Sequence, residues 1–234
     1  MFKLKEWWKF ITKPAYVENP VPSANFFRIS LKIFIVSILI MGTLNFLTKI
    51  IIPIFLTLPD NNALEFGNLE KYPVYYYFIT LAIFSPIIEE IIFRLSLVFK
   101  PIYLSLSVSS LTSLILYKTI NHYLALIVFI VLFFLIKYLA GFNYDYLFRI
   151  WRKYFKSIFY FIAISFGLIH ITNYTFNNPA QLIIVPFLIL PQIVLGLLLS
   201  YARVYFKKGF IMSLFVHILL NSISLTVNYI SNYS

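Results

Sequence analysis

The sequence contains no cysteine among its 234 residues. Disulfide bonds, thiolate metal sites and cysteine nucleophiles are therefore excluded. Charge is also scarce, because 12% of the residues are charged, whereas soluble domains have about 25%. Acidic side chains are the scarcest, with eight Asp and Glu against 19 Lys and Arg. This composition argues against a soluble domain and makes any acidic residue inside an apolar run informative.

Apolar residues make up 61% of the chain, and the mean hydropathy is +0.88. Runs of about 20 apolar residues, the length that a bilayer-spanning helix needs, recur along most of the sequence. We therefore expect an all-α, polytopic integral membrane helical bundle of about seven transmembrane helices. The expected spans are about 33–56, 73–99, 101–117, 122–140, 157–171, 181–206 and 210–230. No internal repeat or low-complexity tract is visible.

Residues 1–32 form a basic N-terminal segment that includes Trp7 and Trp8. Such a mixture is typical of the membrane interface, where aromatic rings lie at headgroup level and lysines face lipid phosphates. We expect no cleavable signal peptide, because the first 25 residues lack an uninterrupted apolar core. The predicted domains are this interfacial segment and a transmembrane domain at 33–230. The basic residues flank apolar spans, so the net charge of +11 favours contact with the lipid bilayer, not with nucleic acid.

The distribution of basic residues predicts the orientation in the cell membrane. With a cytoplasmic N-terminus and seven spans, 16 of the 19 lysines and arginines fall on the cytoplasmic side, and only Lys49, Lys71 and Lys118 do not. This bias favours a cytoplasmic N-terminus and an extracytoplasmic C-terminus. The cytoplasmic set is Lys3, Lys5, Lys9, Lys13, Arg28, Lys32, Arg94, Lys100, Lys137, Arg149, Arg152, Lys153, Lys156, Arg203, Lys207 and Lys208.

Two adjacent carboxylates, Glu89 and Glu90, lie within the apolar run from 74 to 99. An ionisable side chain inside a membrane segment costs several kcal/mol, and it marks a candidate functional site. Glu90 and Arg94 are four residues apart on a helix, with the acid first, which favours an ion pair. We expect that pair to be structural. Glu89 faces about 100° away and has no expected partner within its own helix, which leaves it available for chemistry.

Two histidines lie in other predicted spans. Phe166 and His170 share one helix face, and His217 and Asn221 share another, because each pair is four residues apart. Together with Glu89 these groups supply a general base, an imidazole to orient it or a water, and donors for a developing oxyanion. This set is typical of a hydrolase that attacks a carbonyl with water.

The same residues form three motifs, Glu89-Glu90-x-x-x-Arg94, Phe166-x-x-x-His170 and His217-x-x-x-Asn221. In type and order they resemble the motifs of the CPBP family of intramembrane endopeptidases, which includes CAAX prenyl proteases and bacterial abortive-infection and bacteriocin-processing proteins. The resemblance covers roughly residues 80–225. It implies that Glu89 activates water with help from His170 and that His217 and Asn221 form the oxyanion site. Glu90 and Arg94 would hold the architecture, and Phe166 would serve packing.

The resemblance implies hydrolysis of a membrane-associated peptide or protein without a cofactor. Zinc ligation by one glutamate and two histidines is the less favoured alternative, because the sequence lacks a His-Glu-x-x-His motif. A non-catalytic membrane immunity or regulatory protein on the same scaffold is the alternative function, and a small proton-relaying transporter is a third. Neither the substrate nor the oligomeric state follows from the sequence. One difficulty is depth: His170 and Glu89 meet only if the fifth span extends to about Phe176, which we expect, or if the helices are strongly tilted or broken.

Overall fold

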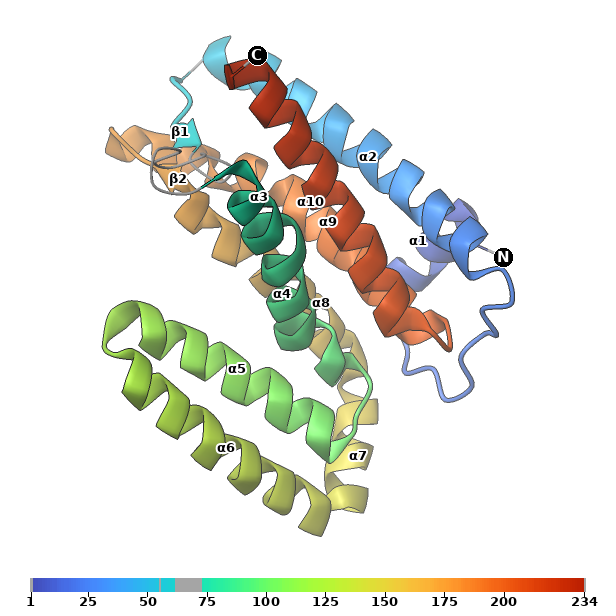
Figure 1. Cartoon of the computed structure of the whole chain (residues 1–234). Coiled ribbons are helices and arrows are strands. Elements are labelled where there is room, and N and C mark those ends of the chain that lie inside the picture. Colours follow the sequence, from blue (N-terminus) through green and yellow to red (C-terminus); the bar gives the residue numbers. More distant parts are fainter. Residues whose placement is uncertain (1, 55, 62–72, 234) are drawn as a thin grey trace.

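The computed structural model describes residues 2–54, 56–61 and 73–233, and within them the protein is an all-α helical bundle (Figure 1). Lys71, which bears on the predicted orientation, lies outside the described residues. The α-helices are α1 (Leu4–Thr12), α2 (Phe26–Ile51), α3 (Val74–Tyr77), α4 (Ser85–Phe93), α5 (Pro101–Thr119), α6 (His122–Phe142), α7 (Tyr144–Lys153), α8 (Phe155–Ile169), α9 (Val185–Tyr205) and α10 (Gly209–Tyr233).

Short helical turns and one small ribbon connect these helices. The turns are η1 (Ile52–Ile54), the π-helix η2 (Phe78–Phe84), η3 (Leu95–Leu97), η4 (His170–Asn173) and η5 (Pro179–Ile184). The strands β1 (Asp60–Asn61) and β2 (Tyr174–Thr175) pair antiparallel, with Asp60 opposite Thr175. The ribbon joins the chain that follows α2 to the chain that follows η4.

Five of the described helical segments are long and apolar enough to cross a membrane, by length and composition. They are Phe26–Ile54, His122–Phe142, Phe155–Asn173, Pro179–Tyr205 and Gly209–Ser231. The other two predicted spans are also helical: Val74–Phe93 forms one rod of α3, η2 and α4, and α5 is a shorter apolar helix. The protein is therefore membrane-embedded, while the count of seven crossings stays a prediction.

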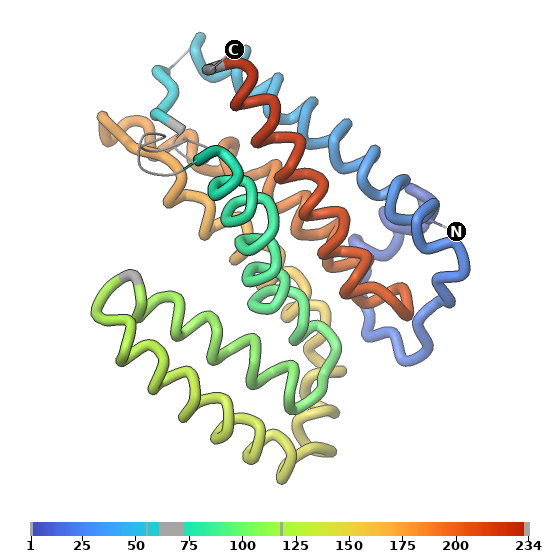
Figure 2. Tube along the Cα trace, viewed as in Figure 1, coloured from blue at the N-terminus to red at the C-terminus, as the bar shows by residue number. Residues whose placement is uncertain are grey.

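The helices divide into a main bundle and a hairpin (Figures 1 and 2). In the main bundle α9 packs against α2, α8 and α10, and α10 also contacts α2, η2 and α4. The hairpin consists of α5 and α6, and α5 packs on α4 and on the η3 turn. The helix α4 therefore lies between the hairpin and the main bundle, which places its two glutamates at the junction.

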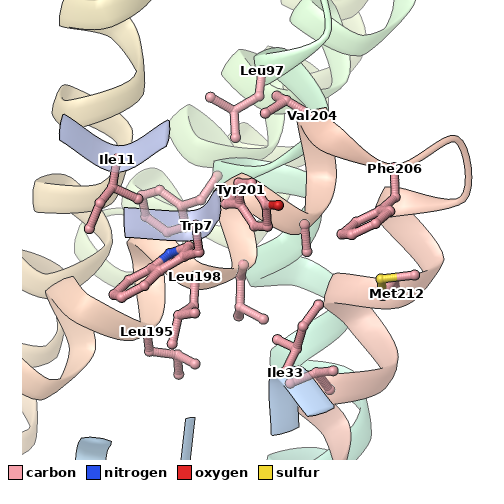
Figure 3. Close-up of a cluster of buried hydrophobic side chains, with 14 of the residues drawn as sticks. Trp7, Ile11, Ile33, Leu97, Leu195, Leu198, Tyr201, Val204, Phe206 and Met212 are labelled. Atoms are coloured by element: carbon pink, nitrogen blue, oxygen red, sulfur yellow. The ribbon is translucent and has the colours of Figure 1, made fainter. Parts of the chain in front are cut away.

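The N-terminal helix α1 is amphipathic and packs on the bundle through Trp7 and Ile11, which are both buried. Figure 3 shows these two side chains beside Tyr201 of α9. Of the two tryptophans expected at headgroup level, only Trp8 is exposed, at 62%. Trp7 instead belongs to the largest apolar core cluster, which holds α1 against the bundle.

The predicted boundary between the N-terminal segment and the first span differs from the observed helix start. The helix α2 begins at Phe26, whereas the span was expected from 33. Arg28 and Lys32 therefore lie in the first turns of α2 and not in a preceding segment. Long basic side chains at a helix end reach the interface with their charged tips, so the apolar run alone places the helix start too late.

Close approach of α8 and α9 depends on Gly167. A Cβ atom at Gly167 would lie 2.3 Å from Cγ1 of Ile193, well inside van der Waals contact. The close neighbour at this glycine is thus Ile193 of α9. This contact draws α8 against the bundle one turn before His170.

Candidate active site

The acidic motif lies on a helix whose geometry changes just before it. The rod that carries the motif is a π-helix over Phe78–Phe84 and an α-helix from Ser85. The N–H of Ser85 bonds to the carbonyl of Thr80, five residues earlier, and Pro86 has no N–H to donate. Proline thus accounts for the wide turn, and π-turns often occur at functional sites.

Glu90 and Arg94 form the expected buried pair. Nε of Arg94 lies 3.6 Å from Oε1 of Glu90, and both side chains are fully buried. The guanidinium also lies over the ring of Phe166, 4.0 Å from its centroid. None of its three nitrogens has a hydrogen-bond partner within the described residues. Arg94 is therefore held by its charge contacts with Glu90 and Phe166.

His217 joins the two glutamates. Its Nδ1 lies 3.0 Å from Oε1 of Glu90, and its Nε2 lies 3.6 Å from Oε2 of Glu89. Glu89 and Glu90 were expected on separate helix faces with separate roles. Their side chains do leave the helix in different directions, but both reach the same imidazole because its two nitrogens lie on opposite sides of the ring. The helices thus bring His217 to both carboxylates of the acidic motif.

Glu89 is the more accessible carboxylate of the two. Its side chain is 19% exposed, against none for Glu90. The expectation that Glu89 has no partner in its own helix was wrong, because the hydroxyl of Ser85 donates to Oε1 of Glu89 at 2.7 Å. The spacing of four residues could have revealed this contact, but the serine lies outside the three motifs.

His170 follows α8 directly and forms the first residue of η4. This span extends to Asn173 in the form of a 3₁₀ turn and ends there, short of the expected end near Phe176. The Nδ1 atom of His170 donates to the carbonyl of Phe166 at 2.7 Å. Because a carbonyl only accepts, Nδ1 carries the proton, which leaves the lone pair of a neutral ring on Nε2.

Phe166 connects the two histidines with Arg94. Its fully buried ring has centroid distances of 4.9 Å to His170 and 5.7 Å to His217. Phe166 therefore has the expected packing role, and its ring packs against both imidazoles and the Arg94 guanidinium.

Asn221 is the motif residue whose contact differs most from expectation. Its amide Nδ2 donates to the carbonyl of Leu81 at 3.1 Å. Leu81 lies in η2, so the bond joins α10 to the turn above the glutamates. The oxyanion role for His217 and Asn221 stays a prediction, and the observed contacts direct their donors to the glutamates and to this carbonyl.

Arg203 is a buried residue that the motifs did not reveal. The sequence places it among the cytoplasmic charges, and the structure shows that it is 8% exposed. Its Nε donates to the carbonyl of Arg94 at 3.0 Å, and its Nη2 donates to that of Leu95 at 3.4 Å. Carbonyls at the end of a helix lack intrahelical donors. Arg203 therefore fastens α9 to the end of α4, just after the acidic motif.

The donor set does not fit a zinc ion. No three His, Cys, Asp or Glu side chains among the described residues gather closely enough to hold a metal. His217 has both ring nitrogens against carboxylates, and His170 has Nδ1 against a backbone carbonyl. We derive no step through a metal from this arrangement, and hydrolysis without zinc stays a prediction.

No family model, curated protein or solved structure matches the chain. The likeness to the CPBP endopeptidases therefore rests on three short motifs, Glu89-Glu90-x-x-x-Arg94, Phe166-x-x-x-His170 and His217-x-x-x-Asn221.

Proposed function

We propose that the protein is an intramembrane endopeptidase that hydrolyses a peptide bond of a membrane-associated protein or peptide, with Glu89 as general base. The observation that carries the proposal is the pair of contacts made by His217, at 3.0 Å to Glu90 and 3.6 Å to Glu89. Residues 127 and 128 positions apart in the sequence thus meet in the interior of a membrane bundle.

The two carboxylates differ in ways that suit different roles. Glu90 is fully buried and paired with Arg94, so its charge is already compensated. The Glu89 side chain is partly exposed, although its Oε2 atom, like Oε2 of Glu90, is itself buried and has no hydrogen-bond partner within the described residues. Glu89 is thus the carboxylate better suited to accept a proton from water. His217 links it to the compensated pair.

His170 supplies a second polar group at the site. Its Nδ1 bond to Phe166 holds the ring in one orientation and leaves Nε2 as an acceptor for water. In the proposed reaction Glu89 takes a proton from water, the resulting hydroxide attacks the scissile carbonyl carbon, and the proton passes to the leaving amine. Donors near the site stabilise the tetrahedral oxyanion that the attack forms, before the C–N bond breaks and releases the amine and the new carboxyl group.

A comparison of new protein termini tests the proposal without a known substrate. Cells that make wild-type protein are compared with cells that make Glu89→Gln or His170→Ala, and new N-termini in the membrane fraction are identified by mass spectrometry. Glu6→Gln is the matched control, because Glu6 forms an exposed pair with Lys3. We expect termini that occur with wild type and control and fall by about 10² or more in both site variants.

Equal membrane accumulation of all variants is required for this comparison. If no terminus depends on Glu89 while accumulation is equal, the protein is not a protease of this kind. That result would favour the non-catalytic immunity or regulatory protein as the function of the same scaffold.

A further inference from the structure

Helical serine and threonine hydroxyls in this protein commonly donate to the backbone carbonyl one turn earlier. Thr80 donates in this way to Tyr76 at 2.7 Å, and Ser222 donates to Ile218 at 2.8 Å. By the same pattern Ser85 would donate to Leu81. Its hydroxyl instead donates to Oε1 of Glu89 at 2.7 Å.

The carbonyl of Leu81 differs from the other helical carbonyls in its donors. The Ser85 N–H, which would reach it in an α-helix, bonds to Thr80, and Pro86 has no N–H for the π-type bond. Without another donor this carbonyl would be an open acceptor next to the Ser85 hydroxyl. Asn221 fills it from α10 with a bond of 3.1 Å.

We propose that Asn221 positions the Glu89 carboxylate through Ser85, an inference that rests on the proposed role of Glu89 as the base. By donating to the Leu81 carbonyl, Asn221 competes with the Ser85 hydroxyl for that acceptor, and the hydroxyl holds Oε1 of Glu89 instead. Oε2 is left on the side of His217, 3.6 Å from Nε2. Ser85 and Asn221 are thus positioning residues, and neither needs to touch substrate.

This role differs from the oxyanion role in its consequences. An oxyanion donor acts on the substrate independently of Ser85, so the fold-losses in cleavage rate from substituting the two residues would multiply. A residue that acts only through Ser85 loses its effect once the serine hydroxyl is gone. A double-mutant cycle between Ser85 and Asn221 therefore separates the two roles.

The first measurement needs no substrate. Dicyclohexylcarbodiimide, an apolar reagent, modifies protonated carboxyl groups in membranes, and mass spectrometry with Glu89→Gln as reference assigns the label to Glu89. A carboxylate that loses a donor holds a proton more readily. We expect labelling of Glu89 to become about tenfold faster in Ser85→Ala, the effect of one hydrogen bond to a charged group. Ser85→Thr should label as wild type does.

The Asn221 variants complete the cycle. In Asn221→Leu the carbodiimide should label Glu89 as fast as it does in Ser85→Ala, because the serine hydroxyl then turns to the Leu81 carbonyl. The double variant should label no faster than either single variant. Asn221→Ala replaces Asn221→Leu if the leucine variant does not accumulate in the membrane.

Two matched controls exclude general loosening of the helices. Thr80→Val removes a hydroxyl from the same π-turn, and Asn228→Leu removes an amide from the same helix, where its Oδ1 has no partner within the described residues. Both should label Glu89 at the wild-type rate. Unchanged labelling in Ser85→Ala, or additive rates in the double variant, would overturn the proposal.

Cleavage provides the second measurement. If Asn221 acts through Ser85, the double variant should cleave as slowly as the slower single variant. If Asn221 is an oxyanion donor, its loss should cost about 10²–10³ in rate, also in the Ser85→Ala background, and the proposal is refuted. An absence of cleavage in wild type refutes the proposed function instead, while the labelling cycle still decides how Glu89 is held.

Discussion

Neutralising Glu90 should destabilise the protein more than neutralising Arg94, although the two form one ion pair. Glu90→Gln leaves Arg94 fully buried, without a hydrogen-bond partner for its guanidinium among the described residues. Its remaining attractive contacts are the rings of Phe166 at 4.0 Å and Phe93 at 5.9 Å and the more distant charge of Glu89. Arg94→Gln instead leaves Glu90 with Nδ1 of His217 at 3.0 Å.

The magnitudes follow from these remaining contacts. Removing one partner of a buried ion pair costs about 3–5 kcal/mol, because the other charge stays uncompensated. We expect this full cost for Glu90→Gln. A hydrogen bond to a charged group contributes about 1.5–3 kcal/mol, and the contact with His217 should lower the cost of Arg94→Gln to about 1–3 kcal/mol. The double variant should lose less unfolding free energy than Glu90→Gln, since no uncompensated charge remains.

Unfolding of the purified protein in lipid nanodiscs or mild detergent, followed by tryptophan fluorescence, measures these differences. Glu6→Gln is the control, because the pair of Glu6 with Lys3 is exposed and should contribute less than about 1 kcal/mol. The reasoning is refuted if the double variant loses the sum of the two single losses. It is also refuted if Arg94→Gln is the least stable variant.

Three further predictions follow from the packing, the donor set and the charge distribution. Gly167→Ala should lower the unfolding free energy by about 1–3 kcal/mol, because its Cβ would lie 2.3 Å from Ile193. Gly42→Ala is the control, since its Cβ would meet nothing within 4 Å. Adding Ile193→Ala to Gly167→Ala should restore part of the lost unfolding free energy. Cleavage should persist after treatment with a membrane-permeant chelator, and a loss that zinc alone restores would contradict this expectation. A cysteine placed at Ser231 should react with an impermeant maleimide on intact cells, because the C-terminal end is expected outside and the chain has no other cysteine; labelling only after lysis would mean a miscounted crossing.

The positions of the long helices could be predicted from apolar runs, because burial in lipid requires about 20 such residues in sequence. The ends could not. The helix α2 starts at Phe26 although Arg28 and Lys32 interrupt the apolar run, and the rod carrying the glutamates ends at Phe93, where Arg203 binds the following carbonyls. Helix ends depend on tertiary partners as much as on local sequence.

The meeting of His217 with the acidic motif could also be predicted, because charged and imidazole side chains in apolar helices need one another as partners. The contacts of Ser85 and Asn221 could not be predicted in the same way. They depend on a carbonyl that becomes available at Leu81, and a backbone acceptor leaves no residue pattern in the sequence. Pro86 was the one visible sign of it.

The glutamates illustrate how neighbouring residues acquire different chemistry. Glu89 and Glu90 are identical in type and adjacent in sequence, so local propensity cannot distinguish them. Their environments do: Glu90 is fully buried against Arg94 and His217, while Glu89 is 19% exposed and held by the Ser85 hydroxyl. A carboxylate with a permanent counter-charge is poorly suited to exchange protons, and one with a neutral donor and some access is better suited. The assignment of the base to Glu89 therefore rests on its partners, and changing those partners is the most direct way to test it.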